Sequence, residues 1–321
     1  MNLNTLTSQN FEEIFGKIVE GNFGEEETKK FLIDLNEANL PQNAFIGATS
    51  ALRSRMKKIS APANAIDVCG TGGDRLNTLN ISTSVCFVVA AAGIPVAKHG
   101  NKAISSQSGS ADIFSELGVK ISSEVLEIEK NLREKNLCFL FAPLFHEALK
   151  NVATIRKSLG IPTIFNFLGP LLNPANTSFQ LIGVSRHDVM PKMLSALSHS
   201  KKVSIVHGFD KMDEITLCDK SYLLRMEEGK IFEEEIIDPQ KFGFKKIAID
   251  SLLGKDPKYN AQKLLELLNG EKSDYRDIVT LNAAFALKMA QKVNNIEEGI
   301  EMARNLIDNR KALKVLEEIR K

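Results

Sequence analysis

Glycines and hydroxyl-bearing residues cluster directly after apolar, strand-like runs, in the pattern of loops that bind phosphate. Residues 67–74 read Asp-Val-Cys-Gly-Thr-Gly-Gly-Asp. Glycine lets backbone N–H groups approach an anion closely, and successive amides of such a turn form an anion-binding nest. Position 75 is Arg75 rather than the glycine of a dinucleotide fingerprint, and no Gly-Lys-Ser/Thr sequence occurs, so neither NAD nor Walker-type nucleotide binding is indicated. Taken alone, the turn fits phosphate binding and a tight structural loop equally well.

Three further segments favour phosphate binding. Asn-Ile-Ser-Thr at 80–83 opens a predicted helix, where free amides and the hydroxyls of Ser82 and Thr83 meet the positive end of the helix dipole. A helix cap alone explains one of these residues and leaves the rest of the polar cluster unexplained. Lys-His-Gly-Asn-Lys at 98–102 and Ser-Ser-Gln-Ser-Gly-Ser-Ala-Asp at 105–112 follow the next predicted strand. Because ligands bind at the carboxyl ends of parallel strands, these segments predict a pocket for a polyanion.

Two adjacent acidic residues, Asp213 and Glu214, are the candidate metal ligands. Magnesium prefers oxygen ligands and is commonly held by one or two carboxylates together with substrate phosphates. Adjacent acidic residues are usually solvated surface, and we interpret the runs at 25–27 and 233–235 in that way. The pair at 213–214 differs because it follows an apolar run in a strand-to-loop context. Its interpretation therefore depends on the other motifs.

The character of the sequence changes near residue 64. Before it, apolar residues recur at helical spacing, and Gly21, Gly24 and Pro41 divide the region into three or four short helices. After it, short apolar strands alternate with helices, as in an α/β fold with a largely parallel sheet. Strands are expected at 65–69, 95–98, 137–141 and 203–206, helices at 82–92, 111–117 and beyond 256, and antiparallel strands within 222–248.

We therefore predict an α/β protein with a small N-terminal helical domain and a large α/β domain that has a mainly parallel central sheet. The expected boundaries are 1–63 for the helical domain and 64–321 for the α/β domain that binds the phosphorylated substrate. Helices from about 146–178 are candidates to join the helical domain.

Composition excludes several classes of protein. The 41 basic and 40 acidic residues give a net charge of +1, so no general attraction for nucleic acid or for an anionic membrane is expected. The four cysteines form no C-x-x-C pair, which argues against a zinc site or a disulfide framework. The first residues lack the layout of a signal peptide, and the longest apolar run, at 85–97, is too short to span a bilayer. We expect a cytoplasmic protein.

Taken together, the motifs resemble the anthranilate phosphoribosyltransferase family. They are Gly-Thr-Gly-Gly-Asp, Asn-Ile-Ser-Thr, Lys-His-Gly-Asn-Lys and the serine-rich loop, followed by Phe-Asn-Phe-Leu-Gly-Pro-Leu-Leu-Asn-Pro-Ala at 165–175 and by Val206-His-Gly through Asp213-Glu214. The resemblance spans nearly the whole chain. It implies a nucleoside phosphorylase/phosphoribosyltransferase-like fold, a homodimer, and transfer of the phosphoribosyl group of phosphoribosyl pyrophosphate to anthranilate in tryptophan biosynthesis.

The resemblance also implies roles for individual residues. Those expected to bind phosphoribosyl pyrophosphate are Gly70, Gly73, Asp74, Thr78, Asn80, Ile81, Ser82, Thr83, Lys98, His99, Gly100, Asn101, Lys102, Ala103, Ile104, Ser105, Ser106 and Ser110. Anthranilate would contact Gly70, Asn101 and Arg156, while Ser82, Asp213 and Glu214 would hold Mg²⁺, with two ions per subunit. No residue is expected to act as a covalent nucleophile.

Some positions leave alternatives open at the acceptor side. Lys157 stands where relatives often have a second arginine, Pro162 stands where they usually have arginine, and Glu147 replaces a common proline. His99 and His146 each fit either a contact with the acceptor or a structural role.

Two other functions fit parts of the sequence. A pyrimidine-nucleoside phosphorylase shares similar lysine and serine loops, but its chemistry needs no metal-binding acidic pair. A non-catalytic relative that binds nucleic acid would carry a basic surface and would have lost acceptor residues such as Asn101 and Arg156, which are present here.

Overall fold

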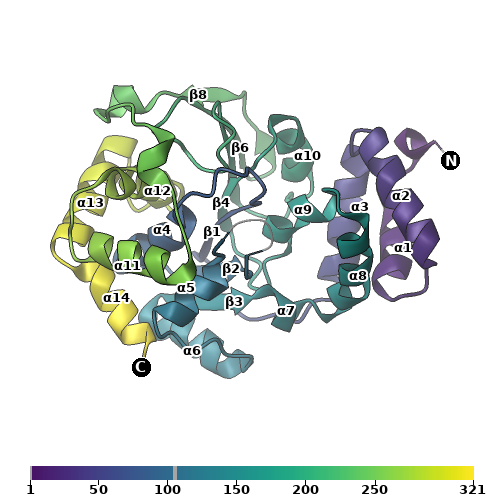
Figure 1. The fold of residues 1–321 in the computed structure, drawn as a ribbon, viewed down its shortest axis with the longest axis horizontal. Coiled ribbons are helices and arrows are strands. Elements are labelled where there is room, and N and C mark those ends of the chain that lie inside the picture. Colours follow the sequence, from purple (N-terminus) through teal and green to yellow (C-terminus); the bar gives the residue numbers. More distant parts are fainter. Residues whose placement is uncertain (1, 104–106) are drawn as a thin grey trace.

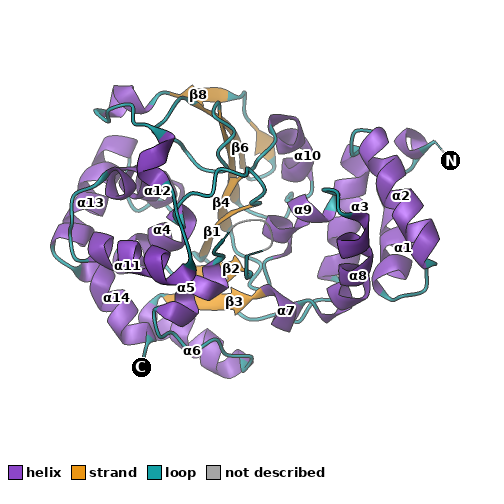
Figure 2. Ribbon diagram, viewed as in Figure 1, coloured by secondary structure: helices purple, strands orange, loops and turns teal. Residues whose placement is uncertain are grey.

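An eight-stranded sheet forms the centre of the computed structural model, which describes residues 2–103 and 107–321. The strands are ordered β3-β2-β1-β4-β5-β6-β7, and β8 pairs with β6. Strands β3, β2, β1, β4 and β5 run parallel, and β6, β7 and β8 extend the sheet by antiparallel pairing. Figure 2 shows the strands in orange among the helices. Their bounds are β1 Ile66–Gly70, β2 Val96–Gly100, β3 Leu137–Phe141, β4 Phe179–Gly183, β5 Lys202–Gly208, β6 Ser221–Glu227, β7 Lys230–Ile231 and β8 Glu235–Ile237.

The parallel strands are short and buried along nearly their whole length, as expected of a sheet covered by helices on both faces. The register pairs Gly70 at the end of β1 with Gly183 at the end of β4, and Gly100 at the end of β2 with Phe141 at the end of β3. The carboxyl ends of these strands therefore lie level along one edge of the sheet, and the loops that leave them start from one line.

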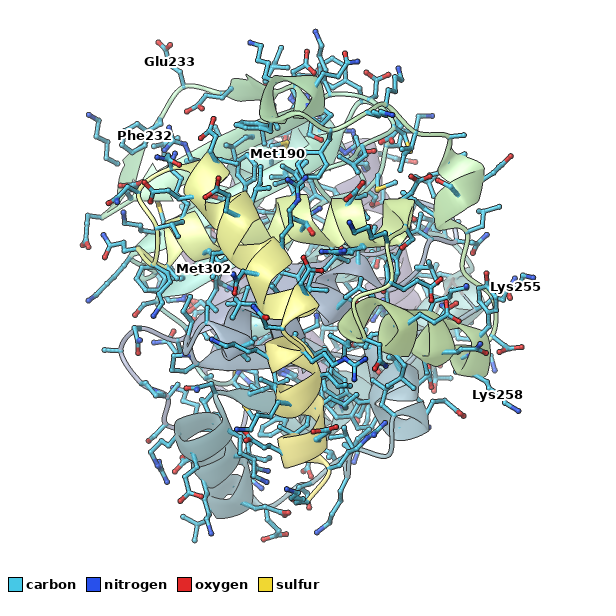
Figure 3. All side chains as sticks on the ribbon, turned by 90° about the vertical axis from the view of Figure 1, so that its left-hand side faces the viewer. Met190, Phe232, Glu233, Lys255, Lys258 and Met302 are labelled. Atoms are coloured by element: carbon cyan, nitrogen blue, oxygen red, sulfur yellow. The ribbon has the colours of Figure 1, made fainter. Side chains whose placement is uncertain are left out.

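Helices from two distant parts of the chain cover one face of the sheet (Figure 1). They are α4 Ile81–Ala91, α5 Ser110–Glu116, α11 Pro257–Leu268, α12 Asp274–Met289, α13 Ile296–Asp308 and α14 Lys311–Ile319, with α6 Val125–Lys135 near the chain's C-terminus. Helices α4 and α12 are buried around most of their circumference, as is typical of central helices. Figure 3 shows this face, with Met302 marking α13, the helix that packs on α12.

The N-terminal helices lie on the far side of the molecule from α11–α14 (Figure 1). They are α1 Ser8–Val19, α2 Glu25–Glu37 and α3 Gln42–Arg53, and the neighbouring helices are α7 Ala142–Phe145, α8 Lys150–Leu159, α9 Phe165–Leu168 and α10 Met190–Ser195. One apolar cluster joins α1–α3 to α8, α9 and α10, and Phe15 meets the ring of Phe165 edge-on at 5.8 Å between centroids. We keep the division at 1–63 and 64–321 as a proposal, with α8 and α9 as the helices that would join the first part.

The predicted fold class is confirmed, and the strands expected at 65–69, 95–98, 137–141 and 203–206 match β1, β2, β3 and β5. Strand β4 was not predicted. Its sequence, Phe-Gln-Leu-Ile-Gly, contains the polar residue Gln180, which is buried. The Gln180 side-chain amide donates a hydrogen bond to the Pro170 carbonyl and accepts one from the Ser200 hydroxyl, so its burial leaves no polar group unpaired. A search for runs of apolar residues therefore does not detect this central strand, because the hydrogen-bond partners of Gln180 lie elsewhere in the sequence.

Two further expectations concern membranes and thiols. Among the described residues, every helix is too short or too polar to cross a bilayer. The four cysteines are free, and Cys69, Cys86 and Cys138 are buried. Burial raises the pKa of the Cys69 thiol and raises that of Cys86 to about 12, so both remain protonated at neutral pH.

Gly47 provides a test of the packing between α1 and α3. A Cβ at this position would lie 2.7 Å from the backbone nitrogen of Glu12 on α1. We expect Gly47→Leu to destabilise the protein by about 1–3 kcal/mol, since overpacking forces the helices apart. Urea unfolding measures the change, with Ser50→Ala on the same helix as the control. An unchanged free energy of unfolding for Gly47→Leu would show that the two helices separate freely.

Candidate functional site

A cavity of about 340 Å³ lies at the carboxyl ends of the parallel strands. The loops that follow β1, β2, β3 and β5 line it, together with α8 and α9. It gathers all of the predicted site residues that the structure describes, namely Gly70, Gly73, Asp74, Thr78, Asn80, Ile81, Ser82, Thr83, Lys98, His99, Gly100, Asn101, Lys102, Ala103, Ser110, Arg156, Asp213 and Glu214. Ile104, Ser105 and Ser106 lie outside the described residues. Motifs separated by up to 144 residues, from Gly70 to Glu214, thus face one space.

The glycine loop after β1 takes backbone conformations that only glycine adopts readily. Gly72 and Gly73 have φ values of +66° and +82°. Both are exposed, and no atom lies within 4 Å of a Cβ built at Gly72. Glycine at these positions therefore serves the backbone conformation rather than close packing within the protein.

Asp213 lies against the ends of β1 and β4. A Cβ on either of the register partners Gly70 and Gly183 would collide with Asp213, with its carboxylate in the first case and its backbone carbonyl in the second. The Asp213 carboxylate accepts a hydrogen bond of 2.7 Å from the Gly72 amide. The two glycines therefore make room for Asp213, and the glycine loop holds its carboxylate.

Glu214 connects the acidic pair to the start of α4. Its Oε1 accepts a hydrogen bond of 3.0 Å from the backbone amide of Ser82, and the side chain is 8% exposed. The acidic pair and the Asn-Ile-Ser-Thr segment, 132 residues apart in sequence, are therefore in direct contact. The Ser82 hydroxyl also lies at the cavity, so carboxylate and hydroxyl oxygens line the same space.

The acidic pair lies in an environment that disfavours its negative charge. Burial, and then the charge of Asp74, raises the pKa of Asp213, while burial and the charge of Asp213 raise the pKa of Glu214. Lys98 acts in the opposite direction on Glu214. The Asp74 Oδ2 atom is buried without a hydrogen-bond partner in the described part of the chain. Among the described residues, no three acidic, histidine or cysteine side chains are arranged to hold a metal ion by themselves. A hard divalent cation, which prefers oxygen ligands, would therefore need hydroxyl or substrate oxygens beside the carboxylates of this cluster.

The two lysines of the loop after β2 lie in different environments. Lys102 is exposed at the cavity, whereas Lys98 is 3% exposed and its ammonium donates to the Val68 carbonyl at 2.8 Å. Burial alone would lower the pKa of Lys98, but the nearby carboxyl groups of Asp67 and Glu214 help to hold it above the usual value. Lys98 is therefore a fixed, buried cation beneath the site, and Lys102 is free to reach an anion in the cavity.

His99 and His146 form a buried pair. Their Nε2 atoms are 3.2 Å apart, so one ring donates and the other accepts. Burial lowers the pKa of His99 well below its usual value and lowers that of His146 to about 4. Both imidazoles are therefore neutral at neutral pH and line the cavity as hydrogen-bonding groups without charge.

Arg156 supplies positive charge at the α8 side of the cavity. It is half-buried, and its guanidinium lies over the Phe165 ring at 5.5 Å from the centroid. Lys157 and Pro162, the departures from the family pattern, are exposed and do not line the cavity. The same holds for Glu147.

Several cavity residues had no predicted role. Among them are Arg75, Asn77, Phe165, Asn166, Leu168, Gly169, Pro170 and Leu172. The last six belong to the segment at 165–175, which carried the resemblance without any assignment of individual residues. The motif itself was the signal that could have identified them.

Comparisons with known proteins agree along the whole chain. A family model described as "Glycosyl transferase family, a/b domain" matches residues 62–313. The anthranilate phosphoribosyltransferase of Endomicrobium trichonymphae is 38% identical over 320 residues, which cover 99% of this chain and 95% of that protein. The corresponding protein of Petrotoga mobilis is 40% identical, with 98% and 92% covered.

Solved structures show the same similarity. The anthranilate phosphoribosyltransferase of Thermus thermophilus superposes with a TM-score of 0.91 at 30% identity, covering 98% of this chain and 95% of that one. The Saccharomyces cerevisiae enzyme in complex with phosphoribosyl pyrophosphate and Mg gives a TM-score of 0.89 at 27% identity, with 98% and 92% covered. Similarity of this extent includes the strands that carry the cavity and the helices in front of them, and it shows that the chain belongs to the anthranilate phosphoribosyltransferase family.

Proposed function

We propose that the protein transfers the phosphoribosyl group of phosphoribosyl pyrophosphate to the amine of anthranilate. The products are N-(5-phosphoribosyl)anthranilate and pyrophosphate, in the biosynthesis of tryptophan. The observation that carries the proposal is a single cavity in which the glycine-loop amides, the acidic pair and the Arg156 guanidinium face a common space. Donor phosphates, a divalent cation and an acceptor carboxylate need three different environments, and this cavity offers all three.

The donor is proposed to bind at the ends of β1 and β2. The glycine loop and the start of α4 line this part of the cavity, where the helix dipole favours an anion, and the exposed Lys102 offers a charge. Two of their amides, those of Gly72 and Ser82, are bound to the carboxylates of Asp213 and Glu214. Lys98 acts from below, where its buried charge offsets part of the acidic pair's charge. The other predicted donor-binding residues that the structure describes also line the cavity.

Ser82, Asp213 and Glu214 are proposed to hold Mg²⁺, with two ions per subunit. The fit rests on the donor set and on the unpaired Asp74 oxygen beside it. When bound, magnesium supplies positive charge that stabilises the leaving pyrophosphate.

The reaction needs positioning and electrostatic stabilisation more than a strong base. The bond between ribose C1 and pyrophosphate breaks with its electron pair on the leaving group, and the amine nitrogen of anthranilate forms the new bond to C1. That nitrogen then loses one proton to solvent or to the released pyrophosphate. Positive charge develops on the ribose and negative charge on the pyrophosphate. Amides and cations fixed around the leaving group lower the barrier, and a cavity that holds the amine near C1 removes much of the entropic cost.

Anthranilate is proposed to bind toward α8 and α9, in contact with Gly70, Asn101 and Arg156. A guanidinium can form two parallel hydrogen bonds to a carboxylate, and the Phe165 ring beneath it is an apolar surface for an aromatic ligand. The neutral pair of His99 and His146 also lines the cavity and can hydrogen-bond there without repelling a positive ribose.

The protein is further proposed to be a cytoplasmic homodimer, with the N-terminal helices at its interface. The support is the family resemblance. The near-balanced charge gives no reason to expect nucleic acid or a membrane as a partner.

The double variant Asp213→Asn with Glu214→Gln distinguishes a role of the acidic pair in activity from a role in folding. It keeps the size of both side chains and one acceptor oxygen on each. We expect turnover to fall at least about 100-fold, because a charged metal ligand is lost at both positions. We expect melting in metal-free buffer to stay the same or rise. Because burial raises the folded-state pKa of both carboxyls, their ionisation destabilises the parent, and the parent loses stability as pH rises through that pKa.

The advantage in melting temperature of this double variant over the parent should therefore grow as the pH is raised from about 5 to about 8. Calorimetry without metal and turnover against magnesium concentration measure the two effects. Full activity of the variant in the presence of a chelator would show that Asp213 and Glu214 are not metal ligands.

Arg156→Ala tests whether Arg156 binds the acceptor, anthranilate, rather than the donor, phosphoribosyl pyrophosphate. Losing a charged hydrogen bond costs about 2–3 kcal/mol, which corresponds to roughly 30- to 150-fold in apparent affinity. We expect this rise in the Michaelis constant for anthranilate and little change in that for phosphoribosyl pyrophosphate. Lys157→Ala is the matched control, because Lys157 is the next residue on α8 and is exposed away from the cavity. Equal effects on both substrates would indicate a folding defect, and none on either would place Arg156 outside the acceptor site.

A further inference from the structure

Helix α12 carries two buried polar side chains that reach loops of the proposed site. Tyr275 and Asn282 are separated by seven residues, which is close to two helical turns, so they project from nearly the same face. Asn282 is fully buried and Tyr275 is 4% exposed. Buried polar groups are almost always hydrogen-bonded, and here the principal partners lie outside the helix.

Asn282 pairs with both backbone groups of Ile215, the residue that follows the acidic pair. The Ile215 amide donates to Asn282 Oδ1 at 3.0 Å, and Asn282 Nδ2 donates to the Ile215 carbonyl at 2.9 Å. The second Nδ2 proton goes to the Ile278 carbonyl, also at 2.9 Å. Both residues are fully buried, so water cannot replace these bonds. The side-chain amide therefore fixes the position and the orientation of the peptide next to Glu214.

Tyr275 binds the start of α4, the segment whose Ser82 amide donates to Glu214. Its hydroxyl lies 2.6 Å from the Ser84 hydroxyl and donates to the Asn80 carbonyl at 3.2 Å. Asn80 is the residue at the N-cap position of α4 and Ser84 lies in the first turn, on either side of Ser82. One face of α12 thus binds the backbone beside Glu214 at one end and the start of α4 at the other.

We propose that Asn282 is a positioning residue for the metal ligands, and that α12 uses Asn282 and Tyr275 to set Glu214 opposite Ser82. The proposal rests on the proposed function, in which Ser82 and Glu214 hold Mg²⁺. A buried asparagine could serve stability alone, but both of its contacts outside the helix fall on the residue adjoining the acidic pair. Partners that orient metal ligands typically change metal affinity about 10- to 100-fold when removed.

The test uses two variants of Asn282 and one control. Asn282→Leu keeps the approximate size and removes every bond of the amide. Asn282→Thr is milder, because a hydroxyl there can still reach back to the Ile278 carbonyl, as the Thr280 hydroxyl does to Arg276, while it is too short to span both groups of Ile215. Thr280→Val is the matched control, since it removes a buried hydrogen bond that stays within the same helix.

Binding of Mn²⁺ is measured by electron paramagnetic resonance in the presence of phosphoribosyl pyrophosphate, alongside thermal melting and the Michaelis constant for anthranilate. We expect both Asn282 variants to bind Mn²⁺ about 10- to 100-fold more weakly, with the anthranilate constant nearly unchanged. Thr280→Val should lower the melting temperature and leave Mn²⁺ affinity as in the parent.

Parental Mn²⁺ affinity in a folded Asn282→Thr protein would overturn the proposal and leave Asn282 a residue of the core. If neither Asn282 variant folds, Tyr275→Phe decides: weakened Mn²⁺ binding supports the role of α12, and parental binding overturns it. If the parent itself binds no Mn²⁺ with phosphoribosyl pyrophosphate, the proposed metal site fails, which is distinct from a failure of this inference.

Discussion

The central constraint of this structure is the gathering of Asp74, Asp213 and Glu214 at one partly buried place beside the sheet. Burial, and then mutual repulsion, raises the pKa of Asp213 and Glu214, and Lys98 offsets only part of this effect on Glu214. Such an arrangement costs stability unless a cation arrives with the substrate. Much of the surrounding architecture can be understood as a means of holding these carboxylates in spite of their repulsion.

The sheet contributes space and the helices contribute anchors. Gly70 and Gly183 are register partners on neighbouring strands, and both must lack a side chain for Asp213 to lie where it does. Amides of Gly72 and Ser82 then bind the two carboxylates. Because these donors also belong to the loops proposed to bind phosphate, the metal ligands and the phosphate loops are parts of one hydrogen-bonded unit.

Much of this could be predicted from the sequence, because local patterns determine it. The alternation of strands and helices indicated the sheet, and glycine and hydroxyl clusters marked the loops that meet at its edge. Strand β4 was not predicted, because the hydrogen-bond partners that allow Gln180 to be buried lie 10 and 20 residues away in the sequence. For a related reason, the sequence did not predict the burial of Lys98 or the pairing of His99 with His146. Both depend on contacts between strands and loops that no single segment of sequence contains.

The distribution of charge also bears on how two anionic substrates are kept apart. With the proposed assignment of the site, the acidic cluster would repel the anthranilate carboxylate and would accept the donor pyrophosphate only together with a cation. Arg156 would attract a carboxylate on the α8 side, where burial lowers the pKa of both histidines and leaves them without competing charge. Repulsion at one side and attraction at the other discriminate between two orientations more strongly than attraction alone. Lys157 and Pro162 lie outside the cavity, so their departure from the family pattern leaves this arrangement intact.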